Sequence, residues 1–568
     1  DIINSFLNRN PRSDKIATVL HNDVTYSDPA DIADQFANFF FNVEPTLPLL
    51  NEMALDHLPH SFFLFPTTPD EIINVIGTLK MTSAGLDGIH PSHIKIVAHL
   101  ISNVFSSIVN LMFRTGVFPH ELKQGKIIPI HKKGDASLLN NYRPICILPF
   151  LSKVIEKLIC TCLTSYLNKF NILSPCQFGF RSGYSSDLAL ISLTDQLKKA
   201  IDNYAGSVFI DLTKAFDSIN HHILFNKLEA FGITGPTLLL LRSYLCNRTQ
   251  KVVISNAYLS TKLTNIGVPP GSILGPLLFL LYINDLPKCL SSSSCILYAD
   301  YTTIFNSDSS ITSLTGKLNF DLAQLVRWCS NNMLEINTSK TKFVVFSSPR
   351  KPLPPIPPVI IARNDIPVSD CCRFLGVELD SNLKYHRHVA YIRKKMTYDV
   401  RLLIKSRLYF NPSILMSLYF SFVHSHISYC ITSWGNTYTT HLTSVQTIQN
   451  QAIRILTSSP YLSNAKSLLH ENNILTVSEL VKYNLGIYMY RTINNQLPHF
   501  TTILSNNNVT RFALNNNFLL PKVRTNYGKQ TIHFSGISFW NSLPSDIKVC
   551  RSLKVIKSKL KNHIMSTN

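Results

Sequence analysis

Two short stretches, far apart in the sequence, carry carboxylates in a pattern typical of a metal site. In the segment 296–305, Asp300 falls in a tight turn between two β-prone runs, which predicts a β-hairpin with an acidic tip. The segment 208–210 is a short apolar strand whose end delivers Asp211. If the two strands pair in one sheet, the carboxylates meet and suit a hard divalent cation. Taken alone, the hairpin is more simply explained as a plain surface hairpin.

Basic side chains gather around a second pair of predicted strands. An apolar run at 126–130 ends in a turn with Lys132 and Lys133, and the following strand carries Arg143. At one edge of a sheet these groups would form a phosphate clamp, since arginine can bind phosphate through two parallel hydrogen bonds. A solvated basic turn is the alternative. Lys340 lies in a further loop, before a predicted strand at 342–346.

Two other stretches have residue types suited to contact with bases. In the segment 177–181, Phe178 and Phe180 stand beside Gln177 and Arg181, and could stack on a base or simply pack. The segment 267–276 is a rigid turn that feeds an apolar helix, predicted over 277–286 as part of the core. Within that turn Gly271 exposes backbone that a planar base pair could approach closely.

The surrounding pattern predicts many helices and several strands. Helical spacing is found over 31–43, 68–79, 151–167, 312–331, 388–406, 413–429, 442–456 and 553–563. The segment 349–358 holds six prolines and is expected to be a stiff connector, followed by a strand over 374–379.

The positive charge is unevenly distributed. The chain has 568 residues, 45% of them hydrophobic, and a formal net charge of +20. Residues 381–568 hold 22 Lys and Arg against 4 Asp and Glu, a net +18, which leaves +2 for the rest. Such a basic part suits a polyanion, either nucleic acid or a membrane surface. A membrane is the weaker expectation, because the longest apolar run, around 277–283, is shorter than the ~20 residues of a spanning helix.

Cysteine spacing and the N-terminal sequence indicate the compartment. The 12 cysteines form no CxxC pattern or Cys/His ladder, so we expect no structural zinc and a reducing environment. The N-terminal residues have no signal-peptide pattern, which predicts that the chain is not secreted. The chain begins at Asp1 without an initiator methionine, and we expect it to be a fragment of a longer polyprotein.

Taken in order, these segments resemble the reverse transcriptase of non-LTR (LINE-type) retrotransposons, especially the jockey-like lineages. The matching stretches are 83–88, 141–145, 177–181, 209–217, 271–276, 298–300 and 374–376. The resemblance implies an α+β right-hand polymerase with fingers, a palm built on an antiparallel sheet, a helical thumb and a basic C-terminal region. The expected division is 1–64 for an N-terminal extension, 65–205 for the fingers and start of the palm, 206–382 for the palm, 383–460 for the thumb and 461–568 for the basic C-terminal region.

The resemblance also implies an RNA-directed DNA polymerase that uses two Mg²⁺ ions, with Mn²⁺ as a possible substitute. Asp211 and Asp300 would be metal ligands, joined by the backbone of Leu212. Lys340 would lie near the leaving pyrophosphate. Phe216 would be a steric gate that leaves no room for a ribose 2′-hydroxyl and so favours dNTPs.

The remaining roles concern substrate and nucleic acid. Lys132 or Lys133, with Arg143, would clamp the triphosphate, and Gly271 would lie against the new base pair. Contacts with the RNA template and the DNA primer are expected from Gln177 and Arg181, and from three basic thumb residues, Arg393, Lys394 and Lys395.

Two residues depart from the family pattern. Tyr301 stands where the family has the second aspartate of its hairpin, and Pro270 stands where it has glutamine. Loss of one carboxylate from a two-metal site predicts a rate lower by about 10² to 10⁴. Asp308 lies too far along the strand to compensate. The alternatives are a non-catalytic nucleic-acid-binding remnant and an inactive pseudogene product.

The resemblance carries two further expectations. The endonuclease that such elements carry upstream is missing from this chain. The product is expected in the cytoplasm with the element RNA, and in the nucleus during integration.

Overall fold

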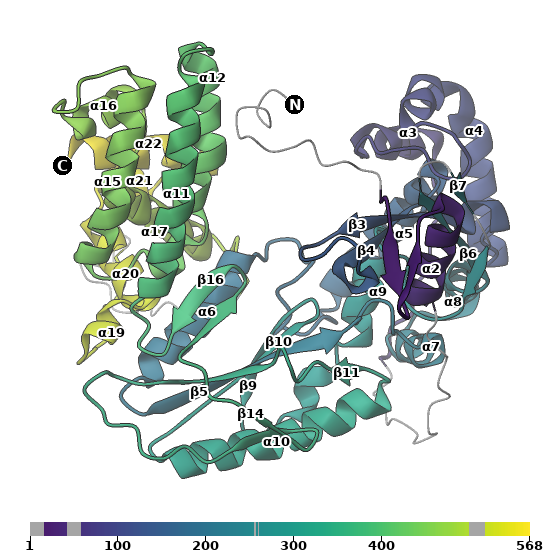
Figure 1. Ribbon diagram of the computed structural model, residues 1–568, viewed down its shortest axis with the longest axis horizontal. Coiled ribbons are helices and arrows are strands. Elements are labelled where there is room, and N and C mark those ends of the chain that lie inside the picture. Colours follow the sequence, from purple (N-terminus) through teal and green to yellow (C-terminus); the bar gives the residue numbers. More distant parts are fainter. Residues whose placement is uncertain (1–15, 42–57, 255–256, 259–260, 499–516, 568) are drawn as a thin grey trace.

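The structure is a computed structural model, and it describes residues 16–41, 58–254, 257–258, 261–498 and 517–567. Figure 1 shows a base crossed by strands, with two arms that rise from it and stand apart. One arm holds α2 to α5 and the sheet around β3, and the other holds the helices from α11 onward. This is the arrangement of a right-hand polymerase, with palm, fingers and thumb.

The palm is an antiparallel sheet centred on β5 (Tyr204–Thr213). Its strand order is β11-β5-β10-β9, and β12 also pairs with β5. The other strands are β9 (Ser294–Tyr298), β10 (Tyr301–Asp308), β11 (Glu335–Ile336) and β12 (Lys342–Phe346).

Both faces of the palm sheet are covered. Val208 and Ile210 share one core with Leu314 and Leu318 of α10 (Ile311–Asn331), whereas Phe209 shares another with Leu190 of α6 (Ser186–Ala200). Alternate residues of a strand point to opposite faces, so a strand buried on both sides is apolar throughout. The continuous apolar run before Asp211 is thereby explained.

The fingers sheet has the order β4-β3-β6-β7, with β8 also paired to β6. Its strands are β3 (Gln124–His131), β4 (Tyr142–Ile147), β6 (Arg248–Ile254), β7 (Ala257–Tyr258) and β8 (Lys262–Thr264). The strands β6 to β8 belong to the range predicted as palm, yet β6 pairs in parallel with β3. The chain therefore returns to the fingers after its first palm strand.

Several helices surround the fingers sheet and the palm. They are α2 (Pro29–Phe41), α3 (Pro69–Thr78), α4 (Pro91–Thr115), α5 (Phe150–Lys169), α7 (His221–Ala230), α8 (Gly235–Leu245) and α9 (Gly275–Tyr282). The Thr68 hydroxyl accepts the Glu71 N–H at the start of α3, as the capping pattern predicts. Val43, the last residue of the first predicted helix, lies outside the described residues.

Helix α4 corrects the expectation that no segment is long and apolar enough to span a membrane. Among the described residues it is the one helix that meets this test by length and composition, and 39% of its most apolar window is buried inside the protein. Its inner face packs on α3 and α8, whereas Ile96, Leu100 and Val104 are largely exposed. Sequence inspection missed it because scattered serines and histidines interrupt its apolar runs.

The second arm combines the thumb with the C-terminal region. The thumb helices are α11 (His386–Ser406), α12 (Pro412–Leu418), α13 (Ser425–Ser428), α14 (Ile431–Trp434) and α15 (Thr439–Leu456). They are followed by α16 (Ala465–Glu471), α17 (Val477–Ile493), α19 (Asn526–Lys529), α20 (Ile532–Ser542), α21 (Ser545–Lys548) and α22 (Leu553–Ser566). The helix predicted over 413–429 is interrupted by a π-helical turn at Tyr419–His424.

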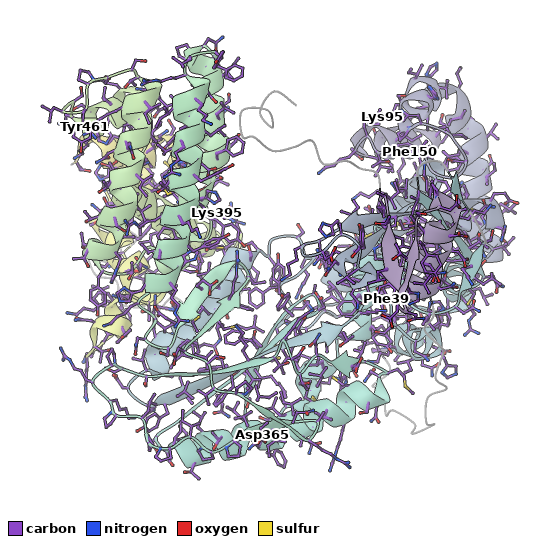
Figure 2. The ribbon with its side chains drawn as sticks, viewed as in Figure 1. Phe39, Lys95, Phe150, Asp365, Lys395 and Tyr461 are labelled. Atoms are coloured by element: carbon purple, nitrogen blue, oxygen red, sulfur yellow. The ribbon has the colours of Figure 1, made fainter. Side chains whose placement is uncertain are left out.

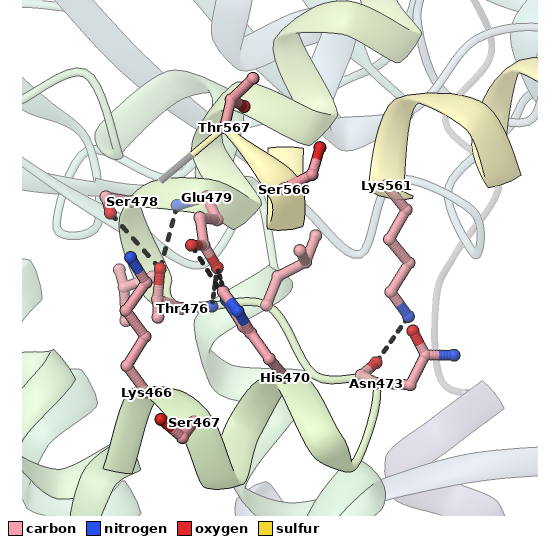
Figure 3. A network of polar contacts seen from close by, with 12 residues as sticks. Lys466, Ser467, His470, Asn473, Thr476, Ser478, Glu479, Lys561, Ser566 and Thr567 are labelled. Carbon is pink, nitrogen blue, oxygen red and sulfur yellow. Dashed lines mark hydrogen bonds and ion pairs between the residues drawn. The ribbon is translucent and has the colours of Figure 1, made fainter. Parts of the chain in front are cut away.

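A buried polar network fixes the start of α17. The Glu479 carboxylate accepts the Thr476 N–H at 2.9 Å and lies 3.0 Å from His470 Nε2, and the Thr476 hydroxyl accepts the Glu479 N–H (Figure 3). This is a reciprocal capping box. Nearby, the Lys561 ammonium of α22 donates to the Asn473 carbonyl, so the last helix is bound to the same corner.

Two predicted elements differ from the structure. The strand predicted over 374–379 is a hairpin of β15 (Cys371–Phe374) and β16 (Val377–Asp380), because Leu375 and Gly376 both have positive φ and turn the chain. The helix predicted over 277–286 ends at Tyr282, and a 3₁₀ turn follows at Leu286–Cys289. The small hairpins β1 (Val19–His21) with β2 (Val24–Tyr26), and β13 (Val359–Ile361) with β14 (Asn364–Ile366), complete the sheets.

Candidate active site

The palm sheet brings the two predicted carboxylates together. Tyr301 is the register partner of Asp211, so the turn that carries Asp300 lies at the end of β5. Ala299 and Asp300 form a two-residue turn between Tyr298 and Tyr301, with Ala299 at φ 54°. Two-residue hairpin turns require positive φ, which a non-glycine residue adopts only where its surroundings hold it.

The electrostatics of the two aspartates are coupled. Burial raises the pKa of Asp300 above its ordinary value, and the Asp211 carboxylate raises it further, while Lys340 and Arg143 act in the opposite direction. Lys340 Nζ lies 3.0 Å from Asp211 Oδ2. The Lys340 ammonium therefore lies beside the carboxylates, in a position that would also favour a metal cation.

The donor set fits a hard divalent cation, with one deficiency. The Asp211 carbonyl accepts the Asn337 N–H, on the β11 side of β5. Because successive carbonyls of a strand point to opposite neighbours, the Leu212 carbonyl points to the other side, toward the Asp300 turn. Two carboxylates and one carbonyl are the oxygen ligands that Mg²⁺ prefers. Within the described ranges, however, no group of three or more Asp, Glu, His or Cys side chains is arranged for a metal ion.

Tyr301 lies where a third carboxylate would complete the set. Residues directly opposite in an antiparallel pair share one face, so the Tyr301 ring stands on the Asp211 side of the sheet. Burial raises the pKa of the Tyr301 phenol, and the charges of Asp211 and Asp300 raise it further. The phenol therefore stays neutral at physiological pH and is a weak ligand for a metal.

The fingers hairpin presents cations to the same place. Arg143 is the register partner of Ile130, and the Lys132 N–H donates to the Asn141 carbonyl, so Lys132 and Arg143 are neighbours at the open end of the β3–β4 pair. Burial lowers the pKa of Lys132, and repulsion from Arg143 and Lys340 lowers it further. Lys133 is exposed in the adjoining bend. Lys132, Arg143 and Lys340 thus converge near the aspartates.

Phe216 is held rigidly beside this group. Its ring stacks on Phe279 of α9 at 4.4 Å and meets the edge of Phe180 at 6.2 Å. The backbone of its segment is fixed as well, because the Val268 N–H donates to the Phe216 carbonyl. Phe180 is largely exposed and Phe178 is buried, so only one of the two phenylalanines can meet a base.

Gln177 and Arg181 require a correction, because the structure directs both inward. Gln177 is buried, and its Oε1 accepts the N–H groups of Gly179 and Ala299 at 2.8 and 3.1 Å. Arg181 donates to the Ser174 and Gln177 carbonyls. In this conformation Gln177 is buried and holds the turn that carries Asp300, and Arg181 is partly buried against its own loop. The residue types could not reveal this, because the hydrogen bond joins segments far apart in sequence.

The turn before α9 is held by a residue that sequence reasoning missed. Gly271 is exposed with φ +91°, and the Pro270 carbonyl accepts the Cys146 N–H. The Glu156 carboxylate of α5, fully buried, accepts the N–H groups of Ile273 and Leu274 at 2.6 and 3.3 Å. The only sequence signal was a charged residue among the apolar positions of a helix.

The predicted nucleic-acid residues of the thumb lie on α11. Arg393, Lys394 and Lys395 are all exposed. In Figure 2, Lys395 lies on the side of α11 that faces the fingers arm. This cationic surface therefore borders the space between the arms.

Comparison with known proteins finds similarity to reverse transcriptases. Residues 130–379 match the model of the family "Reverse transcriptase (RNA-dependent DNA polymerase)". The probable RNA-directed DNA polymerase from transposon BS of Drosophila melanogaster is 28% identical over 75% of this chain and 48% of its own length. The probable polymerase from transposon X-element of the same species is 29% identical over 81% of this chain and 51% of its own length. The polymerase from mobile element jockey of that species is 25% identical, also over 81% of this chain and 51% of its own length.

The chain thus spans about half the length of the curated relatives it matches. A solved telomerase structure from Candida albicans is similar over 65% of this chain and 65% of its own, with 14% identity and a TM-score of 0.33. The motifs, the family match and these relatives agree: residues 130–379 match the reverse transcriptases, and the chain is similar to those of non-LTR, LINE-type retrotransposons.

Proposed function

We propose that the chain is built to extend a DNA primer on an RNA template with dNTPs, and that Tyr301 impairs this chemistry. The observation that carries the proposal is the convergence of Asp211 and Asp300 with three cations, Lys132, Arg143 and Lys340. Negative ligands for a metal and positive partners for a triphosphate therefore lie close together. Phosphoryl transfer needs this combination of positioning and charge stabilisation.

Asp211, Asp300 and the Leu212 carbonyl would hold Mg²⁺, or Mn²⁺ in its place. When bound, two such ions would activate the attacking 3′-oxygen and stabilise the leaving oxygens of an in-line displacement. Arg143 and Lys132 would bind the phosphates of the dNTP, with Lys133 at the rim. Lys340 would release Asp211 and neutralise charge on the leaving group. Phe216 would exclude a 2′-hydroxyl, since its ring is held between Phe279 and Phe180.

The exposed backbone at Gly271 would lie against the new base pair. Arg393, Lys394 and Lys395 would contact the phosphates of the template–primer duplex. For the same thumb surface, a second candidate function is nucleic-acid binding without catalysis. The net +18 of residues 381–568 favours it, and it requires no third carboxylate.

The site of action follows from this function. The protein would act with its RNA in the cytoplasm and at target DNA in the nucleus. The packing of α4 on α3 and α8 favours a helix of the fingers over a membrane span.

Primer extension on an RNA template distinguishes the two functions. We expect slow, Mg²⁺-dependent incorporation of dNTPs, abolished by Asp211→Asn, together with tight binding of an RNA–DNA hybrid. Binding without any extension, even after Tyr301→Asp, would support the non-catalytic function. Absence of both would contradict both proposals.

A further inference from the structure

Helix α4 has an apolar face that the described part of the chain leaves largely uncovered. Five of its large apolar side chains have between 44% and 71% of their surface exposed: Ile96, Leu100, Val104, Ile108 and Leu111. We call these five side chains the α4 face. Successive members are three or four residues apart, so they lie on one side of the helix, over a length of about 22 Å. A helix normally turns such an apolar stripe toward a core.

The α4 face is also free of charge. The Lys and Arg residues of α4 are Lys95 and Arg114, one near each end, and the helix has no Asp or Glu. The Lys95 ammonium is bound to the end of α3, since it donates to the Gly77 and Leu79 carbonyls at 3.1 and 2.6 Å. Positions 96–113 therefore offer a partner no carboxylate, ammonium or guanidinium with which to pair.

The exposed apolar surface is large enough for a specific interface. Leu239 of α8 extends it, because that side chain is 54% exposed and its Cβ would lie 2.6 Å from a Cβ added at Gly116, the residue that caps α4. These six side chains present roughly 700 Å² to solvent, more than the roughly 300–600 Å² of the largest patch on a typical monomer. A stable dimer buries about 800 Å² on each partner.

The α4 face is symmetric about Val104. Leu100 and Ile108 lie four residues away on either side, and Ile96 and Leu111 lie further out in both directions. If two copies of α4 cross antiparallel at Val104, this residue meets its own copy in the partner. Leu100 of one protomer then faces Ile108 of its partner, and Ile96 faces Leu111. An interface with a two-fold axis requires this self-complementarity.

The distribution of charge favours a second copy of the chain as the occupant. Residues 381–568 carry a net +18, and the rest of the chain carries +2. In Figure 1, α4 lies on the outer side of the fingers arm, and the basic helices from α11 onward form the other arm. Contact through α4 therefore keeps the two basic arms apart. It also leaves the space between the arms of each protomer open.

A lipid surface suits the α4 face less well. Anionic lipids attract basic segments, yet the excess positive charge of this chain lies on the other arm. The neighbouring helix α3 begins with Asp70 and Glu71, both exposed, which an anionic surface would repel.

We propose that the α4 face is a homodimer interface, in which two copies of this chain pack α4 against α4 about a two-fold axis at Val104. The interface uses no residue of the candidate active site, so it is independent of the proposed catalysis.

Sedimentation velocity of the full chain, treated with nuclease and kept at high salt, tests the proposal. Nuclease removes nucleic acid that would bridge two basic chains, and salt screens the repulsion between copies. The wild type should then form a dimer whose fraction rises with protein concentration. A wild type that stays monomeric at every concentration would overturn the proposal. If that monomer binds phosphatidylcholine vesicles, the face belongs to lipid instead.

Charges introduced at the axis locate the interface. Val104→Glu would place two carboxylates against each other and should raise the dimer Kd about 100-fold or more. An equal mixture of Val104→Glu and Val104→Lys should associate again, because the two charges attract. Phe320→Glu is the matched control, since Phe320 is a 55% exposed apolar residue of α10, outside the α4 face. It should dimerise like the wild type. A dimer unaffected by Val104→Glu, or a mixture that stays monomeric, would contradict the two-fold packing.

Cross-linking provides a second measurement that needs no added charge. Val104 is 66% exposed, so its substitutions should leave the Tm nearly unchanged. If a charged variant does not fold, Val104→Cys decides the question: oxidation with diamide should link two copies covalently, whereas Phe320→Cys should give no such link. Absence of a link through position 104 would contradict the proposal. Dimerisation without primer extension would count against the proposed catalysis alone.

Discussion

At the residue scale, the site depends on how two neighbouring carboxylates are neutralised. Asp211 has Lys340 at 3.0 Å, whereas Asp300 is partly buried and its pKa is raised by that burial and by Asp211. A divalent cation between them would relieve both effects. The neutral phenol of Tyr301 contributes little to such a site, because its own pKa is raised by burial and by the same two carboxylates.

Removal of the Asp300 charge should stabilise the protein while abolishing its response to metal. Since the folded pKa lies above the unfolded one, the folded state binds more protons between the two values, and stability falls as pH rises through that window. Asp300→Asn has no carboxyl to ionise at this position and so does not lose stability as the pH rises. Its Tm should therefore exceed that of the wild type at neutral pH. The difference should vanish below a pH of roughly 4.

Mg²⁺ provides the second half of the same experiment. At about ten times its Kd, Mg²⁺ should raise the wild-type Tm by roughly 1–4 °C and leave Asp300→Asn unchanged. Differential scanning fluorimetry with and without Mg²⁺ measures both effects. An equal Mg²⁺ shift in the two proteins would show that the ion binds elsewhere.

At the element scale, the turn that carries Asp300 is held by the loop 177–181. Gln177 accepts the Ala299 N–H, and a Cβ added at Gly179 would lie 2.5 Å from the Ala299 nitrogen and 3.1 Å from the Tyr298 carbonyl carbon. Both are backbone atoms of the hairpin, so they can give way only if the hairpin moves.

Gly179→Ala should therefore displace the turn. We expect a loss of about 1–3 kcal/mol of stability and a large loss of primer extension, measured in a Tyr301→Asp background. Gly316→Ala in α10 is the control, since nothing lies within 4 Å of its added Cβ. It should stabilise by about 0.5–1 kcal/mol. Similar behaviour of the two variants would contradict the close approach of the loop to the hairpin.

Comparison of prediction and structure shows which elements a sequence can reveal. Periodicity and capping located α3, α5, α10 and α11 to within about two residues, because these signals are local. The pairing of Asp211 with Asp300 was predictable, since each ends an apolar strand. The inward roles of Gln177 and Glu156 and the turn at Leu375–Gly376 were not, because they depend on long-range hydrogen bonds or on backbone conformation.

At the scale of the whole molecule, the excess positive charge lies on a different part of the chain from the two aspartates. The aspartates lie on the palm, and the exposed cations Arg393, Lys394 and Lys395 lie on the second arm. Acidic residues that could neutralise this arm are scarce, with 4 Asp and Glu in residues 381–568. A duplex held between the arms would meet this surface along its phosphates.

Changing all three α11 cations to alanine should weaken binding of an RNA–DNA hybrid and flatten its salt dependence. Each lost phosphate contact should reduce the slope of log K against log salt by up to about 0.9. Changing Arg551, Lys554 and Lys557 to alanine removes the same charge near α22, which packs on α17, and should leave the slope nearly unchanged. If the two triple variants behaved alike, net charge would explain binding, and the position of α11 would not.

The most direct measurement compares primer extension by the wild type and by Tyr301→Asp, under single-turnover conditions in Mg²⁺. A third carboxylate restored beside Asp211 and Asp300 is expected to raise the rate by about 10² to 10⁴, and Asp211→Asn in the same background should remove the gain. The variant Pro270→Gln, alone and combined with Tyr301→Asp, shows how much of the rate loss is due to Pro270 and how much to Tyr301. Equal rates for the wild type and Tyr301→Asp, both fast, would contradict the claim that this residue limits catalysis.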